Sequence, residues 1–167
     1  MQRQRRIKKS NRKFWIGLIL FLLIVLFSVF IVFHQAEKPM VTAKSEALQI
    51  AQKYAGIKNV NGFYNSNLGK TYYSVSGNDK RGKAIYVVIA KKGGKVTIID
   101  QKSGLTADQI KQSIENTKKP KKINGIAITL KKSKPYWVVS YVNKSGKLCF
   151  ATTDFKTGKI KKLIANI

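Results

Sequence analysis

The chain has 167 residues, with 33 Lys and Arg against 7 Asp and Glu, and its formal net charge is +26. Its single cysteine, Cys149, excludes an internal disulfide, and the apolar neighbours of this residue predict a buried structural thiol. One histidine and one cysteine far apart in sequence do not make a metal centre, so we expect no metal and no other cofactor.

The first 33 residues predict a membrane anchor. Residues 14–33 hold no charge and no proline, and twenty helical residues at about 1.5 Å each span about 30 Å, the thickness of a hydrocarbon core. Residues 1–13 carry seven Lys and Arg and no acid. This predicts a single-pass protein of the cell membrane, with a cytoplasmic N-terminal tail and an extracellular C-terminal domain. The alternative is a cleaved signal peptide, but His34 fits poorly three residues before a cut after Ala36.

Residues 34–41 are expected to form a spacer, about 25 Å long if fully extended. The chain beyond the anchor carries a net charge of about +19, because 26 of the Lys and Arg and all seven acids follow it. This excess fits either an ordinary soluble surface or attraction to anionic wall polymers such as teichoic acids. The lysines are spread over predicted strand ends and turns without a nucleic-acid-binding signature, so we expect no nucleic acid partner.

The remainder of the chain resembles itself at an offset of 64 residues. Lys70–Ser76 aligns with Lys134–Ser140 in its aromatic and apolar positions, and two glycine turns repeat at the same offset without a gap. This pattern predicts two copies of one small module, at residues 42–102 and 103–167.

Each module is predicted to begin with a helix and to continue as an antiparallel meander, which makes the fold class α+β. Residues at helical spacing predict the buried faces of the two helices, namely Ala43, Ala47, Ile50 and Tyr54 in the first and Thr106, Ala107, Ile110 and Ile114 in the second. Short segments rich in Val, Ile and Tyr predict strands at 57–66, 70–77, 83–90, 95–100, 121–131, 134–142, 146–153 and 159–165.

Two aromatic pairs, Tyr72-Tyr73 and Tyr136-Trp137, occupy equivalent strand positions in the two modules. Successive strand residues point to opposite faces, so one ring of each pair is expected to pack under the helix. The other ring is either exposed or buried between the modules. Exposed rings anchor interfaces, and these four residues are therefore the candidate protein-interaction residues.

No catalytic constellation is present in the sequence. The seven acids are dispersed, and there is no Gly-x-Ser-x-Gly elbow and no Ser-x-x-Lys motif with its companion motifs. We therefore expect no catalytic residues and no enzyme activity.

The basic tail, the single anchor and the two helix-plus-meander modules together resemble a known family. With Thr42–Ala47, Tyr72–Val75 and Tyr136–Val139, the chain resembles the cell-wall elongation regulator TseB-like (YpmB-like) proteins of Gram-positive bacteria, whose modules are similar to PepSY domains with a cystatin-like fold. The resemblance implies a membrane-anchored, non-enzymatic regulator that binds a penicillin-binding transpeptidase. The alternatives are a PepSY-type peptidase inhibitor or chaperone-like module, and a binder of teichoic acid.

Overall fold

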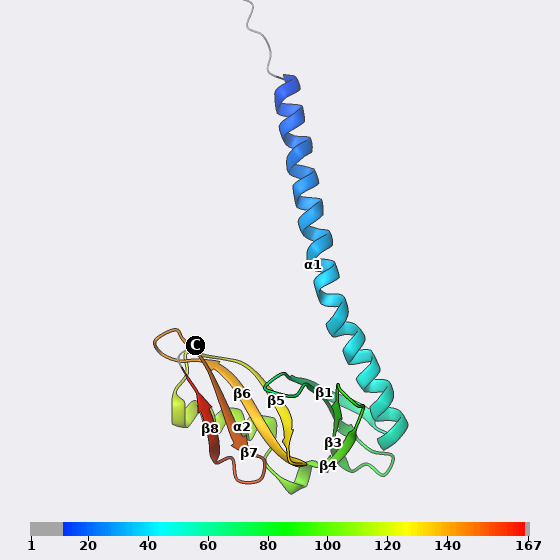
Figure 1. Ribbon diagram of the computed structural model, residues 1–167, viewed down its shortest axis with the longest axis vertical. Helices are drawn as coiled ribbons and strands as arrows, with labels where there is room; N and C mark the ends of the chain where they lie inside the picture. Colours follow the sequence, from blue (N-terminus) through cyan, green and yellow to red (C-terminus); the bar gives the residue numbers. More distant parts are fainter. Residues whose placement is uncertain (1–11, 166–167) are drawn as a thin grey trace, which may run out of the picture. The chain divides into compact units, whose positions relative to one another are not determined.

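The computed structural model describes residues 12–165, with side chains at 14–31 and 39–165 (Figure 1). All eight strands coincide with predicted segments to within two residues at each end. The elements, in chain order, are α1 (Arg12–Ala55), β1 (Lys58–Ser66), β2 (Tyr72–Asn78), β3 (Ala84–Ala90), β4 (Val96–Asp100), the 3-10 turn η1 (Gln101–Ser103), α2 (Ala107–Lys118), β5 (Lys122–Lys131), β6 (Lys134–Val142), β7 (Leu148–Asp154) and β8 (Ile160–Ile164).

Helix α1 contains one stretch that is long and apolar enough to cross a membrane, Phe14–Ile31, with a mean hydropathy of 3.0. The basic residues predicted for the tail at positions 1–11 lie outside the described residues. The predicted spacer at 34–41 differs from the expectation, because its backbone is part of α1. Gln35–Lys38 are strong helix formers, so nothing ends the helix before Pro39. Eight helical residues rise by about 12 Å, half the extended length.

The chain divides into two compact units, Met1–Thr42 and Ala43–Ile167. The second unit holds two antiparallel sheets, with strand orders β1-β2-β3-β4 and β5-β6-β7-β8. Their equivalent turns are built alike: Gly82 and Gly146 both have positive φ, and each donates its N–H to a carbonyl oxygen, of Asp79 and Asn143 respectively, at 3.0 Å. The 64-residue repeat therefore recurs in the backbone hydrogen bonds.

The C-terminal turns of α1 cover one face of the first sheet. Ala47 and Ala51 are buried there against Val75, Val87 and other apolar residues of β2 and β3. The predicted stripe was wrong at Tyr54, which is 62 % exposed. The buried stripe follows Ala47, Ala51 and Ala55, rotated by about one residue from the prediction.

Helix α2 lies across one face of the second sheet (Figure 1). Thr106 caps its start through a capping box with Gln109, which satisfies exposed backbone groups of the first turn. The predicted stripe is confirmed at Ala107, Ile110 and Ile114, which are all buried, and was wrong at Thr106, which is exposed because it is the cap.

The two sheets share a core of aromatic side chains. Trp137 is fully buried, and its ring meets Tyr86 edge-on at 5.4 Å and stacks with Phe155 at 5.9 Å between centroids. Its Nε1 donates a hydrogen bond to the carbonyl oxygen of Leu105 at 3.0 Å. Because Tyr86 belongs to the first sheet and Trp137 to the second, the sheets are expected to be stabilised jointly. The α+β class is thus confirmed, with one apolar N-terminal helix and two antiparallel sheets.

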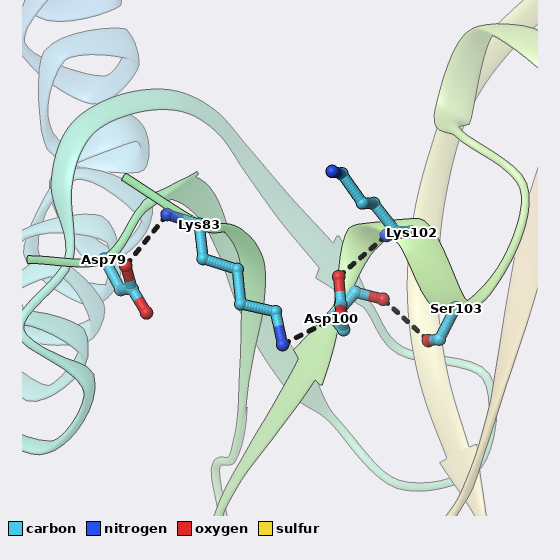
Figure 2. A network of polar contacts seen from close by, with 5 residues as sticks. All are labelled: Asp79, Lys83, Asp100, Lys102 and Ser103. Atoms are coloured by element: carbon cyan, nitrogen blue, oxygen red, sulfur yellow. Dashed lines mark hydrogen bonds and ion pairs between the residues drawn. The ribbon is translucent and has the colours of Figure 1, made fainter. Parts of the chain in front are cut away.

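A polar network fixes the corner between β4 and α2 (Figure 2). The Oδ2 atom of Asp100 accepts from Lys83 Nζ at 2.8 Å, and its Oδ1 atom accepts from the backbone N–H of Lys102 at 2.9 Å. The Ser103 hydroxyl donates to the Asp100 carbonyl oxygen at 2.6 Å. The Lys83 hydrogen bond, followed by that of Lys102, lowers the pKa of the Asp100 carboxyl. The connection between the sheets is therefore a turn that side-chain hydrogen bonds and an ion pair stabilise.

Candidate interaction surface

Each sheet is covered on one face by the helix that precedes it, but the opposite faces differ. In the first sheet the central side chains of β2 and β3 that face away from α1 are buried, and the most exposed of this set, Tyr72, is 8 % exposed, whereas Tyr64 on β1 and Ala90 at the end of β3 are partly buried. The other members of that set are Ser74, Ser76, Tyr86 and Val88.

The positions 64 residues later form what we call the open face, the side of the second sheet away from α2. Val138 is buried there, whereas Tyr136, Ser140, Phe150 and Thr152 are only half-buried. The corresponding face of the first sheet is covered by the second sheet. Among the described residues, no further sheet or helix covers the open face in the same way.

A pocket of about 300 Å³ lies where the end of β1 and the following loop meet the open face. Its walls are Asn65 and Ser66 from the end of β1, Asn67 and Leu68 from the loop, Gly125–Ala127 from β5, and Val138, Ser140 and Phe150 from β6 and β7. The strands β1 and β2 contact β5, so the pocket is built across both sheets. It combines apolar walls with amide and hydroxyl groups, which is typical of binding sites.

Ser66 is the notable polar group of the pocket. It is 3 % exposed, and its hydroxyl has no hydrogen-bond partner among the described residues. A buried hydroxyl without a partner costs about 1–3 kcal/mol, and a bound group could recover part of that cost. Ser74 is likewise buried and unpartnered but does not line the pocket. The Ser140 hydroxyl makes only a long hydrogen bond, donated to the Gly125 carbonyl oxygen at 3.4 Å.

The structure separates the four candidate aromatic residues. Trp137 and Tyr73 pack on the helix side of their sheets, where Trp137 is fully buried and Tyr73 stacks on Phe63 at 6.0 Å. Tyr72 is buried between the sheets, and Tyr136 is half-buried on the open face. The sequence reasoning missed Ser66 and the rest of the pocket. The signal in the sequence that could have indicated the pocket is the alignment of Phe150 with Tyr86 at the 64-residue offset. It places an aromatic ring on the face of the second sheet that is less covered.

The charge on the open face is mainly positive. By register, Lys162 stands opposite Thr152 and Lys122 opposite Val142, both on this face. At its end the Asp154 carboxylate accepts the N–H of Thr157 at 3.0 Å, and such backbone hydrogen bonds keep its pKa below the usual value. Among the described side chains the ion pairs are Lys83–Asp100 and Lys111–Asp108, which leaves most lysines outside ion pairs.

The described residues do not assemble a group of three His, Cys, Asp or Glu side chains that could hold a metal ion. Cys149 is 2 % exposed, and its thiol donates a weak hydrogen bond to the Lys147 carbonyl oxygen at 3.7 Å. The prediction of a buried structural thiol is confirmed. The geometry of the pocket on the open face suits the binding of an apolar group that has polar groups beside it.

Three comparisons with known proteins agree with one another. The family model of the "Cell wall elongation regulator TseB-like domain" matches residues 46–90. A protein of Bacillus subtilis (strain 168) named "Probable cell wall elongation regulator TseB" is 34 % identical over 94 residues, which cover 56 % of this chain and 58 % of that relative. The match therefore spans less than two thirds of the relative's length.

The solved structure of the "YpmB protein from Bacillus subtilis" is similar to this fold, with a TM-score of 0.60 and 28 % sequence identity. The alignment covers 72 % of this chain and 95 % of that chain. Sequence and structure thus point to the same group of proteins, as the opening of the first helix and the aromatic strand positions predicted. The three comparisons together support a relationship of this chain to the TseB/YpmB-like family.

Proposed function

We propose that this chain is a membrane-anchored, extracytoplasmic, non-enzymatic regulator of cell-wall elongation that binds a penicillin-binding transpeptidase. The observation that carries the binding role is the open face with its pocket, an incompletely covered surface that holds the unpartnered hydroxyl of Ser66. The naming of the Bacillus subtilis relative as a cell wall elongation regulator supports the cellular role.

The topology belongs to the same proposal. The excess of Lys and Arg before Phe14 supports a cytoplasmic N-terminus and an extracellular C-terminal part. Cysteine labelling tests this, because the native Cys149 is buried and gives little background. A membrane-impermeant maleimide should label intact cells carrying Lys161→Cys and leave Ser10→Cys unlabelled. The reverse pattern, or a mature chain that begins near Glu37, would overturn the proposed anchor or its direction.

We further propose that residues 42–102 and 103–167 are two PepSY-like modules with a cystatin-like fold. The shared strand order and the matching turns at the 64-residue offset support this division. Of the four candidate interaction residues, Tyr136 lies on the open face, so we place the contact with the transpeptidase there. Tyr72, Tyr73 and Trp137 would then act by supporting the fold that presents this face.

The function is tested in Bacillus subtilis cells that lack their own TseB and express this chain. A photo-crosslinking amino acid at Tyr136 should capture a penicillin-binding transpeptidase, identified by mass spectrometry. The control is the same amino acid at Tyr54, which is exposed on α1. Failure to capture any transpeptidase from Tyr136, together with unchanged cell width when the chain is withdrawn, would refute the proposal.

Binding of anionic wall polymers is a second candidate function, favoured by the net charge of about +19 beyond the anchor. Lysine-based binding releases counterions and must weaken steeply with salt. Retention of the protein on teichoic acid should therefore fall sharply between low and high salt. Retention that does not change with salt would count against this function.

A further inference from the structure

We propose that the pocket on the open face takes an aromatic side chain from an extended, acidic polypeptide segment of the partner. This inference rests on the proposed function, since it names the kind of segment that the partner presents. The argument uses the repeat within the chain, the dimensions and polar groups of the pocket, and the charge around it.

The first sheet provides an internal precedent for the occupant. Tyr86 on its inner face receives the indole of Trp137 edge-on, with 5.4 Å between centroids and an interplanar angle of 90°. The residue 64 positions after Tyr86 is Phe150, which lines the pocket. Ser76, which pairs with Tyr86, likewise corresponds to Ser140, which pairs with Phe150. The ring of Phe150 thus occupies the position that already accepts an aromatic partner in the first module.

The pocket has suitable dimensions and chemistry for one large ring. Its volume is about 300 Å³, whereas a protein cavity of about 150 Å³ is enough to hold benzene. Leu68, Val138 and Phe150 supply apolar walls. The unpartnered hydroxyl of Ser66 lies in the same lining, and a polypeptide backbone carries both the donors and the acceptors that could satisfy it.

Charge selects the flanks of the segment and argues against a second copy of this chain. Lys122 and Lys162 stand on the open face, and the part of the chain beyond the anchor carries about +19. Two such surfaces repel each other, whereas Asp or Glu on either side of the inserted ring would be attracted. A teichoic acid also matches this charge, but it gains nothing from apolar walls, so the pocket favours a polypeptide.

The test uses the full-length chain in zwitterionic detergent micelles and a fluorescein-labelled peptide, Asp-Glu-Ser-Trp-Ser-Glu-Asp. Two matched peptides replace Trp by Ala, or all four acids by Lys. Gly125→Leu fills the pocket, because a Cβ at Gly125 meets only the Ser140 Oγ at 3.6 Å and its backbone is not left-handed. Ser66→Ala removes the pocket hydroxyl, and Ser74→Ala is its matched control, since it removes an equally buried, unpartnered hydroxyl elsewhere.

The expected result is binding of the acidic Trp peptide, with Kd raised at least about 10-fold by Gly125→Leu and about 2- to 10-fold by Ser66→Ala. Ser74→Ala should leave Kd unchanged, and both matched peptides should bind at least about 10-fold more weakly. The proposal is overturned when the Ala peptide binds as well as the Trp peptide, or when neither Gly125→Leu nor Ser66→Ala weakens binding. Binding of lipoteichoic acid alone, unaffected by Gly125→Leu, would also overturn it, because the site would then be the lysines.

Failure of this inference can be told apart from failure of the proposed function. In the cell assay, transpeptidase capture and normal cell width that persist with Gly125→Leu would refute the pocket and leave the regulator role standing. Peptide binding in micelles without any transpeptidase capture by the unmodified chain would refute that role and leave the pocket standing.

Discussion

Trp137→Phe is the sharpest test of the shared core. The indole nitrogen donates to the Leu105 carbonyl oxygen at 3.0 Å, and phenylalanine cannot replace this bond. Losing one net hydrogen bond costs about 1 kcal/mol, and more when the acceptor stays buried. The smaller ring also leaves a void of about 40 Å³, which costs about 1 kcal/mol at about 24 cal/mol per Å³. The expected total is about 2–3 kcal/mol of unfolding free energy.

The measurement is thermal unfolding of the full-length chain in detergent micelles, followed by circular dichroism. For a unit of this size, a loss of about 2–3 kcal/mol corresponds to a fall in Tm of about 10 °C. Because Trp137 contacts Tyr64 and Tyr86 of the first sheet, both sheets should still unfold in one transition. The control is Trp15→Phe, which changes a 60 % exposed ring in the apolar segment and should leave Tm unchanged.

Two results would refute the reasoning. A fall in Tm below about 2 °C would mean that Trp137 is not the centre of the core. Two separate transitions, with only one shifted by the substitution, would mean that the sheets are stabilised independently and that the ring contacts between them contribute little.

Further predictions concern pH, packing and capping. Burial, followed by the Tyr64 and Asp108 charges, raises the pKa of Tyr86 from 10.0 to about 12. The neutral phenol therefore stabilises the folded state fully below about pH 10, and this stabilisation is lost as the pH rises towards 12. Wild type should therefore lose up to about 2 kcal/mol more than Tyr86→Phe between those pH values, measured by urea unfolding. Gly104→Ala should destabilise by about 1–3 kcal/mol, because its Cβ overlaps the Phe155 ring and carbonyl oxygen, whereas Gly125→Ala should change stability by less than about 1 kcal/mol. Thr106→Ala removes the α2 cap and should lower the unfolding free energy by about 1 kcal/mol in the same assay.

The strands could be predicted because their signals are local. Runs of Val and aromatic residues next to turn residues define β2 and β6, and a cap followed by Ile110 and Ile114 defines α2. The expectation at 34–41 differed because the sequence reasoning placed a boundary at the end of the apolar run. Hydropathy changes there, but helix propensity does not, and α1 continues through Pro39.

The pocket could not be predicted from the sequence because it depends on contacts between distant residues. Ser66 and Phe150 are 84 positions apart and line one pocket only when the end of β1 packs on the second sheet. Nothing in the local sequence distinguishes Ser66, which lines the pocket, from Ser74, which is buried between strands. The rotation of the α1 stripe away from Tyr54 has the same origin, because the sheet decides which face of the helix is covered.

The position of the open face follows from the way the repeat packs. Each helix covers one face of its own sheet, and residues of α2 and the second sheet pack on the remaining face of the first, so among the described residues the second sheet keeps one face without such a cover. The residues on the two faces differ accordingly: the buried Val88 corresponds to the half-buried Thr152, and Tyr86 corresponds to Phe150. A partner that inserts a ring beside Phe150 would repeat the contact that Trp137 makes within the chain. On the proposed function the interaction surface follows from the way the two sheets pack, and Gly125→Leu is placed to fill its pocket at a position outside the shared core.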